Sequence, residues 1–277
     1  MARAIAFAAV CCALDSGHLK AQLPSLNEAP WIGHFAGHST SRGSVGVQSD
    51  GVIVYNGSHD IHPSVQETSS DGKVTIHRLM PETLKSQMQP TDKPTTITYS
   101  GKVKNGTTIE VTIEFVRNQV SIGGAITDPR GRENAQHFAL FIIAPAYYLM
   151  YGERLALEQG TAAEKKKMEQ TIAGQRAHAA KEYLELSKLD GKRIKQPLID
   201  AVDLSSEEFN GDGFNSIKLD LNWFRGRKLD IAATERSRLM LSNKEKRPIF
   251  KNHYYITWTE APGTQSPGKG RMVISMR

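Results

Sequence analysis

The stretch TTITYSGKVKNGTTIEVTIEFV, residues 95–116, decides the fold. Polar and apolar residues alternate on both sides of its Asn105-Gly106 pair, which is the period of a strand with one buried face. An Asn-Gly pair favours a two-residue type I′ turn, because both central residues of that turn need positive φ. The stretch therefore predicts an antiparallel hairpin. Its second strand has four apolar residues on one face: Ile109, Val111, Ile113 and Phe115.

Similar alternation recurs on both sides of this hairpin. Asp50-Gly51 and Asp71-Gly72 are further turn signals. The sequence predicts a mainly β (α+β) protein, built as an antiparallel β-sandwich or a curved, barrel-like sheet. The other strand-like segments are residues 52–54, 74–79, 120–127, 137–144, 214–224, 228–241, 253–260 and 271–276.

The period changes between the two sets of strands. Thr161 and Glu164 match a capping box, and Asp190-Gly191 matches a helix stop. The apolar stripe between them predicts a helix over residues 162–189, with a shorter helix from 147 to 157 before it. We therefore expect a long helical insertion near 147–189. The stripe comprises Met168, Ile172, Ala179, Tyr183 and Leu186.

This pattern gives a simple domain organisation. We expect one β-rich domain over residues 31–277, with a helical insertion at 147–195. The alternative is two β domains, 31–146 and 197–277, joined by the helix. Residues 23–30, which contain Pro24 and Pro30, are expected to be a linker.

The first 22 residues resemble a secretory signal peptide. Arg3 precedes the uncharged run 4–14, which is too short to span a membrane, and Ala21 offers a cleavage point. We therefore expect export to the periplasm, the cell surface or the medium. A lipid anchor at Cys11 or Cys12 is the rival interpretation. Cleavage would remove both cysteines and leave no disulfide.

The charge of the chain is moderately basic. The formal net charge is +6, from 35 basic and 29 acidic residues, and part of the excess lies in the run 165–167. Aromatic residues are scarce near the basic runs, so nucleic acid is not an expected partner. A solvated helix face, or contact with an acidic envelope surface or another partner, accounts for the run. No later segment is apolar enough for a transmembrane helix.

Four histidines are candidates for a metal site, because imidazole suits zinc. His34 and His38 should share one face of an extended strand, about 13 Å apart, which is too far to chelate one ion together. His59 and His62 flank Asp60 in a turn-like stretch. Any such site therefore needs a further ligand from elsewhere in the chain.

Residues 208–213 resemble the opening of a calcium-binding loop. Glu208, Asn210 and Asp212 would supply oxygen ligands, and Gly213 stands at the sixth place. Leu219 stands where the closing carboxylate should be, and strand-like alternation follows instead of a helix. An ordinary turn entering a strand is the competing interpretation.

Paired carboxylates would support glycoside hydrolysis if they lay about 5–9.5 Å apart. Glu110 and Glu114 share a strand face but should be about 13 Å apart. Asp220 lies on the polar face of another strand. Solvent-facing alternation also explains all three, and no nucleophile motif of the Gly-x-Ser-x-Gly type is present.

Aromatic residues offer a binding function instead. Trp31 and Tyr255 are candidates for stacking on a sugar ring, because neither shares a face with a core-like set. The sequence predicts an exported, soluble β-rich protein that acts in binding or envelope structure rather than catalysis, with a polysaccharide or an envelope surface as partner. The alternative is a secreted carbohydrate-active hydrolase. No cofactor is predicted, and calcium or zinc are the only metals considered.

Overall fold

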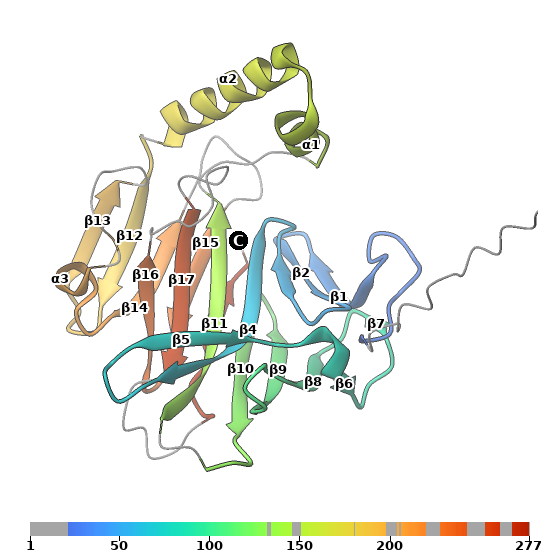
Figure 1. The fold of residues 1–277 in the computed structure, drawn as a ribbon, viewed down its shortest axis with the longest axis vertical. Coiled ribbons are helices and arrows are strands. Elements are labelled where there is room, and N and C mark those ends of the chain that lie inside the picture. The colour runs from blue at the N-terminus through green and yellow to red at the C-terminus, as the bar shows by residue number, and fades with distance from the viewer. Residues whose placement is uncertain are drawn as a thin grey trace, which may run out of the picture.

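The computed structural model describes residues 22–131, 134–145, 151–179, 181–197, 204, 206–219, 228–242, 253–260 and 268–276. The protein is mainly β, with few helices and a large sheet that curls into a half-barrel (Figure 1). This result confirms the predicted mainly β class and its curved, barrel-like form.

The first half of the chain contributes most of the strands. They are β1 (His34–Thr40), β2 (Gly43–Gln48), β3 (Ile53–Tyr55), β4 (His59–Thr68), β5 (Val74–Arg78), β6 (Lys85–Ser86), β7 (Thr91–Asp92), β8 (Thr96–Lys102), β9 (Thr108–Val116), β10 (Gln119–Thr127) and β11 (Ala135–Pro145), with the 3₁₀ helix η1 (Pro81–Thr83) before β6.

The second half begins with helices and returns to strands. Its elements are α1 (Tyr151–Gln159), α2 (Ala162–Ala179), β12 (Tyr183–Lys188), β13 (Arg193–Pro197), α3 (Glu207–Asn210), β14 (Phe214–Leu219), β15 (Leu229–Ala233), β16 (Ser237–Ser242), β17 (His253–Glu260) and β18 (Met272–Ser275).

Strands from both ends of the chain pair with each other. One run of neighbours is β7-β1-β2-β3-β4-β11-β17-β16, and a second is β8-β9-β10-β18-β15-β14-β12-β13. Phe214 of β14 pairs with Leu239 of β16 and links the two runs. The β1–β7 pair is parallel, and the other pairs named here are antiparallel. The C-terminal strands β17 and β18 thus lie against β11 and β10.

The inner face of the curled sheet is filled by apolar side chains. In β9 the predicted face, from Ile109 to Phe115, is buried in a cluster that draws on both halves of the chain. Trp258 of β17 packs edge-on against Phe138 of β11, with ring centroids 6.0 Å apart. Burial of such side chains stabilises the fold by about 1.5–3 kcal/mol each, so the sheet is held mainly by this core.

Five hairpins among the described residues turn at an Asp-Gly or Asn-Gly pair. The β3–β4 hairpin turns at Asn56-Gly57, where both residues take positive φ and Ser58 N donates to Tyr55 O, as in a type I′ turn. The other four hairpins use one common turn. In each, the glycine has positive φ and its N–H donates to the carbonyl three residues earlier. The Asp or Asn side chain accepts from the N–H that follows the glycine. The pairs are Asp50-Gly51, Asp71-Gly72, Asn105-Gly106 and Asp190-Gly191.

This geometry is a type I turn followed by a G1 bulge. The type I′ turn predicted at Asn105-Gly106 is therefore wrong. Asn105 does not take positive φ, because its Oδ1 accepts from Thr107 N at 3.1 Å while Gly106 alone takes φ +93°.

The helical insertion is shorter than the sequence predicts. The capping box is confirmed, since Thr161 N donates to Glu164 Oε2 at 2.8 Å and Glu164 N to Thr161 Oγ1 at 3.4 Å. However, α2 ends at Ala179, and residues 183–188 form β12. There Leu184 and Leu186 are buried at alternate positions against β14, a period of two that the helical stripe overlooked.

Helices α1 and α2 stand apart from the sheet (Figure 1). Figure 1 shows α2 above the curled sheet, beside α1. Along α2 only Met168 is buried among the residues whose side chains are described. No helix in the described part of the chain combines the length and apolar character that crossing a bilayer requires.

Residues 23–30 are expected to be a linker, but they pack on the sheet and form backbone hydrogen bonds with it. Leu23 is buried in the core, and its N–H donates to Ser49 O at 2.9 Å. Leu26 N donates to His34 O at 2.8 Å. The predicted signal peptide, apart from Gln22, lies outside the described residues.

Candidate functional site

A β-bulge separates two of the histidines considered for metal binding. His34 pairs with Gln48 and Ala36 with Val47, so Phe35 is an extra residue in β1. His38 then lies opposite Val45 on the inner face, where its ring stacks on Phe115 at 4.3 Å. His34 instead packs over Gly46 on the outer face. The expectation that His34 and His38 share a face is therefore wrong, because the bulge shifts the alternation by one residue.

The other two histidines also face opposite sides of the sheet. His59 is buried beside Tyr55, with ring centroids 6.0 Å apart. His62 lies opposite Phe141, and its Nε2 is buried without a hydrogen-bond partner among the described residues. Burial, and secondly the nearby Arg78, lower the pKa of His62 to about 4. Within the described ranges, no group of three His, Cys, Asp or Glu side chains is arranged to hold a metal.

The three candidate calcium ligands are on and just after helix α3. Asn210 is buried, and its Nδ2 donates to Leu204 O at 2.6 Å and Leu241 O at 3.0 Å. Its Oδ1 accepts from Leu241 N at 2.8 Å, so the amide bridges α3 to strand β16. Glu208 and Asp212 are exposed around this anchored amide, and strand β14 follows directly.

The candidate catalytic carboxylates do not converge in the described residues. Glu110 and Glu114 are exposed on the outer face of β9, four residues apart on one strand. Their cross-strand neighbours are Ser100 and Ala125 for Glu110, and Thr96 and Ser121 for Glu114. Asp220 lies outside the described residues.

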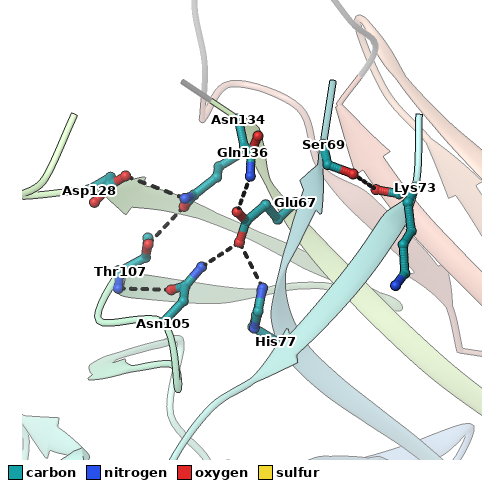
Figure 2. Close-up of polar contacts among 9 residues, drawn as sticks. All are labelled: Glu67, Ser69, Lys73, His77, Asn105, Thr107, Asp128, Asn134 and Gln136. Carbon is teal, nitrogen blue, oxygen red and sulfur yellow. Dashed lines mark hydrogen bonds and ion pairs between the residues drawn. The ribbon is translucent and has the colours of Figure 1, made fainter. Parts of the chain in front are cut away.

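A carboxylate that the sequence did not single out, Glu67 of β4, organises a polar cluster that joins several segments (Figure 2). Asn134 Nδ2 donates to its Oε1 at 2.7 Å. Asn105 Nδ2 and His77 Nε2 reach its Oε2 at 2.9 and 2.8 Å. These donors come from the β8–β9 turn, from β5 and from the residue before β11, so one carboxylate joins four segments.

A second chain of hydrogen bonds continues the cluster. Thr107 Oγ1 donates to Gln136 Oε1 at 2.7 Å, and Gln136 Nε2 donates to Asp128 Oδ2 at 3.3 Å. The hydrogen bonds from Asn134 and Asn105 lower the pKa of Glu67, and His77 adds a smaller effect. Both oxygens of Glu67 already accept hydrogen bonds from internal donors. The cluster therefore stabilises the contacts between these segments, and Glu67 is not available as a general acid or base.

The clearest surface feature surrounds Trp31, a predicted stacking residue. Its half-buried indole lies on a floor made by Gly37 of β1 and Gly46 of β2, which are directly paired. A Cβ at Gly37 would overlap Cδ2, Cε2 and Cε3 of the indole, and a Cβ at Gly46 would come within 3.0 Å of Cζ3. The two glycines are therefore what allows the ring to approach the backbone.

Polar side chains flank this floor along one cross-strand row. The row runs Asp92, Gly37, Gly46, Val54, Asp60 across β7, β1, β2, β3 and β4. Both aspartates are exposed, and paired residues in neighbouring strands share a face. The sequence could not show the row, because it depends on strand order.

Tyr255, the other predicted stacking residue, lies on the outer face of β17. Its ring stacks on Phe141 of β11 at 5.3 Å, with an interplanar angle of 19°. The guanidinium of Arg78 covers Phe141, 5.4 Å from the ring centroid. Phe141 thus occupies one face of the Tyr255 ring. The contact of Trp31 with His34 is instead edge-on, with ring centroids 5.5 Å apart and an interplanar angle of 74°.

Comparison with protein-family models finds no match to this chain, and comparison with curated proteins finds none either.

Proposed function

We propose that the protein is an exported binding protein of the cell envelope or cell surface. Export rests on residues 1–22, whose basic start and short apolar run are typical of a secretory signal. Binding rests on one structural observation: the half-exposed indole of Trp31 lies on the outer face of the sheet over a glycine floor.

The hydrogen bonding and the spacing of the candidate carboxylates favour a binding function over a catalytic one. Glu67 has both oxygens engaged by internal donors. Glu110 and Glu114 stand about 13 Å apart by strand geometry, farther than the 5–9.5 Å or so that glycoside hydrolysis requires. The hydrolase alternative would therefore depend on Asp220, which lies outside the described residues. Binding is the function that the described residues support best.

A secretion reporter tests the export half of this proposal. Residues 1–30 are fused to a β-lactamase that lacks its own signal, in a bacterial host. We expect ampicillin resistance from this fusion. A fusion that begins at residue 23 is the first control, and Ala8→Arg, which interrupts the apolar run, is the matched control.

Resistance that depends on an intact apolar run would support export. Equal susceptibility of all three strains, with the fusion protein present in the cytoplasm, would contradict it.

A further inference from the structure

We infer that the Trp31 surface binds a carbohydrate, with the indole stacking on a sugar ring. We call this surface the Trp31 shelf and define it by Trp31, Gly37, Gly46, Asp60 and Asp92. The inference names the ligand of the binding protein proposed above and rests on that proposal.

The ring lies flat on the sheet. A Cβ at Gly37 would overlap Cδ2, the inner atom of the indole, as well as Cε2 and Cε3 on either side of it. An atom in the ring plane cannot approach all three, so the glycine lies beneath a ring face. The opposite face points away from the strands, and the residue is only half-buried. A planar apolar surface of this kind matches the flat C–H face of a sugar ring.

The neighbours of the ring supply hydrogen-bonding groups. Asp92 is one strand from Gly37, and Asp60 is two strands from Gly46, so the backbones of the two aspartates lie about 5 and 10 Å from the floor. Ser39 and Ser44 form the next pair on the same face. Carboxylates and hydroxyls beside an aromatic platform suit the many hydroxyl donors of a sugar.

The charge of the shelf narrows the ligand class further. Its two carboxylates disfavour an anionic polymer, so a neutral glycan is the expected ligand. A proline-rich peptide also stacks on tryptophan, but it lacks N–H donors at proline and so offers Asp92 fewer hydrogen bonds than a glycan does.

Affinity electrophoresis tests the inference with the full chain. Native gels contain hydroxyethylcellulose, glycol chitin or dextran, and a gel without polymer is the reference. We expect at least one polymer to retard the wild-type protein. Trp31→Ala should weaken this binding at least about tenfold, equivalent to about 1.4 kcal/mol, whereas Trp31→Phe should retain part of it.

Two further variants distinguish a loss of binding caused by loss of stacking from one caused by misfolding. Gly37→Ala keeps the indole but displaces it from the floor, and it should also weaken retardation. Tyr183→Ala is the matched control, because Tyr183 is a 42% exposed aromatic on β12, outside the shelf. Circular dichroism and urea midpoints identify the folded variants, and Asp92→Asn replaces Trp31→Ala in the comparison if the latter does not fold.

Retardation that is lost in Trp31→Ala and Gly37→Ala but kept in Tyr183→Ala would support the carbohydrate site. Absence of retardation in all three polymers would overturn it, as would equal retardation of wild type and Trp31→Ala. Trp31-dependent fluorescence changes with a polyproline peptide, without glycan binding, would assign the shelf to a peptide instead. An exported protein that binds no glycan would overturn this inference and leave the export proposal standing.

Discussion

At the residue scale, single polar side chains fix contacts between distant segments. Glu67 binds donors from residues 77, 105 and 134, and Asn210 joins α3 to β16. Glu67 carries no local motif, and the sequence indicated Asn210 only as a candidate calcium ligand. Their roles depend on non-local strand pairing, so neither could be predicted from spacing.

Glu67→Gln should destabilise the fold. The new amide places an NH₂ group against a donor of Asn105, His77 or Asn134, and hydrogen bonds to a charged group are each worth about 1.5–3 kcal/mol. We expect a loss of about 2 kcal/mol in the free energy of unfolding, measured in urea at pH 7. Glu114→Gln, at an exposed position of β9, is the control and should change this free energy by less than about 0.5 kcal/mol.

The same variant has a defined pH dependence. Because the pKa of Glu67 is lowered in the fold, its stabilisation is present above about pH 4.5 and is lost as the pH falls further. The difference between wild type and Glu67→Gln should therefore shrink below that pH. A difference that stays constant down to pH 3 would argue against the charged cluster.

His62 should make stability pH-dependent in a higher range. The pKa of His62 is lowered to about 4 in the fold, from 6.5 in the unfolded chain, so the unfolded state binds the proton first. This contribution is fully present above pH 6.5, and up to about 3 kcal/mol is lost as the pH falls to 4. Urea titrations across pH 4–7 should give a flatter profile for His62→Gln than for wild type. His178→Gln, exposed on α2, should follow the wild-type slope.

At the element scale, local signals predicted the turns better than the ends of helices. Asp50-Gly51, Asp71-Gly72 and Asn105-Gly106 mark the turns of three hairpins correctly, and the capping box marks the start of α2. Asp190-Gly191, predicted to end a helix, instead forms the turn of the β12–β13 hairpin.

In the segment 183–188 the helical stripe predicts burial of Tyr183 and Leu186. The strand instead buries Leu184 and Leu186 against β14 and leaves Tyr183 exposed.

Loss of the capping box should lower the stability of the helical insertion and leave the stability of the sheet unchanged. Thr161→Ala removes a cap worth about 0.5–2 kcal/mol to the helix, and α2 packs mainly on α1. Hydrogen exchange followed by mass spectrometry should show faster exchange in residues 162–179. Protection of β9 and β10 should not change, and a loss of protection there would show that the insertion supports the sheet.

At the scale of the whole molecule, the C-terminal strands complete the sheet begun by the N-terminal ones. Strand β17 pairs with β11, and β18 pairs with both β10 and β15. The sequence predicted the curvature and most strands, but not these pairings, because contacts between residues far apart in the chain leave no local pattern. Trp31 was predicted as a stacking residue, but its glycine floor and neighbouring aspartates, like the Glu67 cluster, depend on strand order and escaped prediction for the same reason.

These pairings predict the behaviour of a fragment. Residues 22–146 alone would expose the edges of β10 and β11 and lose the core side chains of β17 and β18. We expect this fragment to lack the cooperative urea transition of the full chain. A cooperative transition of comparable midpoint would support the alternative of two β domains.

The identity of the mature N-terminus tests the central claim of export most directly. Leu23 is 3% exposed in the core, and its N–H bonds Ser49 O. A signal peptidase must therefore cut before Leu23 to leave the sheet intact. The measurement is intact mass and N-terminal sequencing of the protein recovered from separated cellular fractions. An exported form that begins at or just before Leu23 is expected, whereas a cytoplasmic form that retains residues 1–21 would contradict the account.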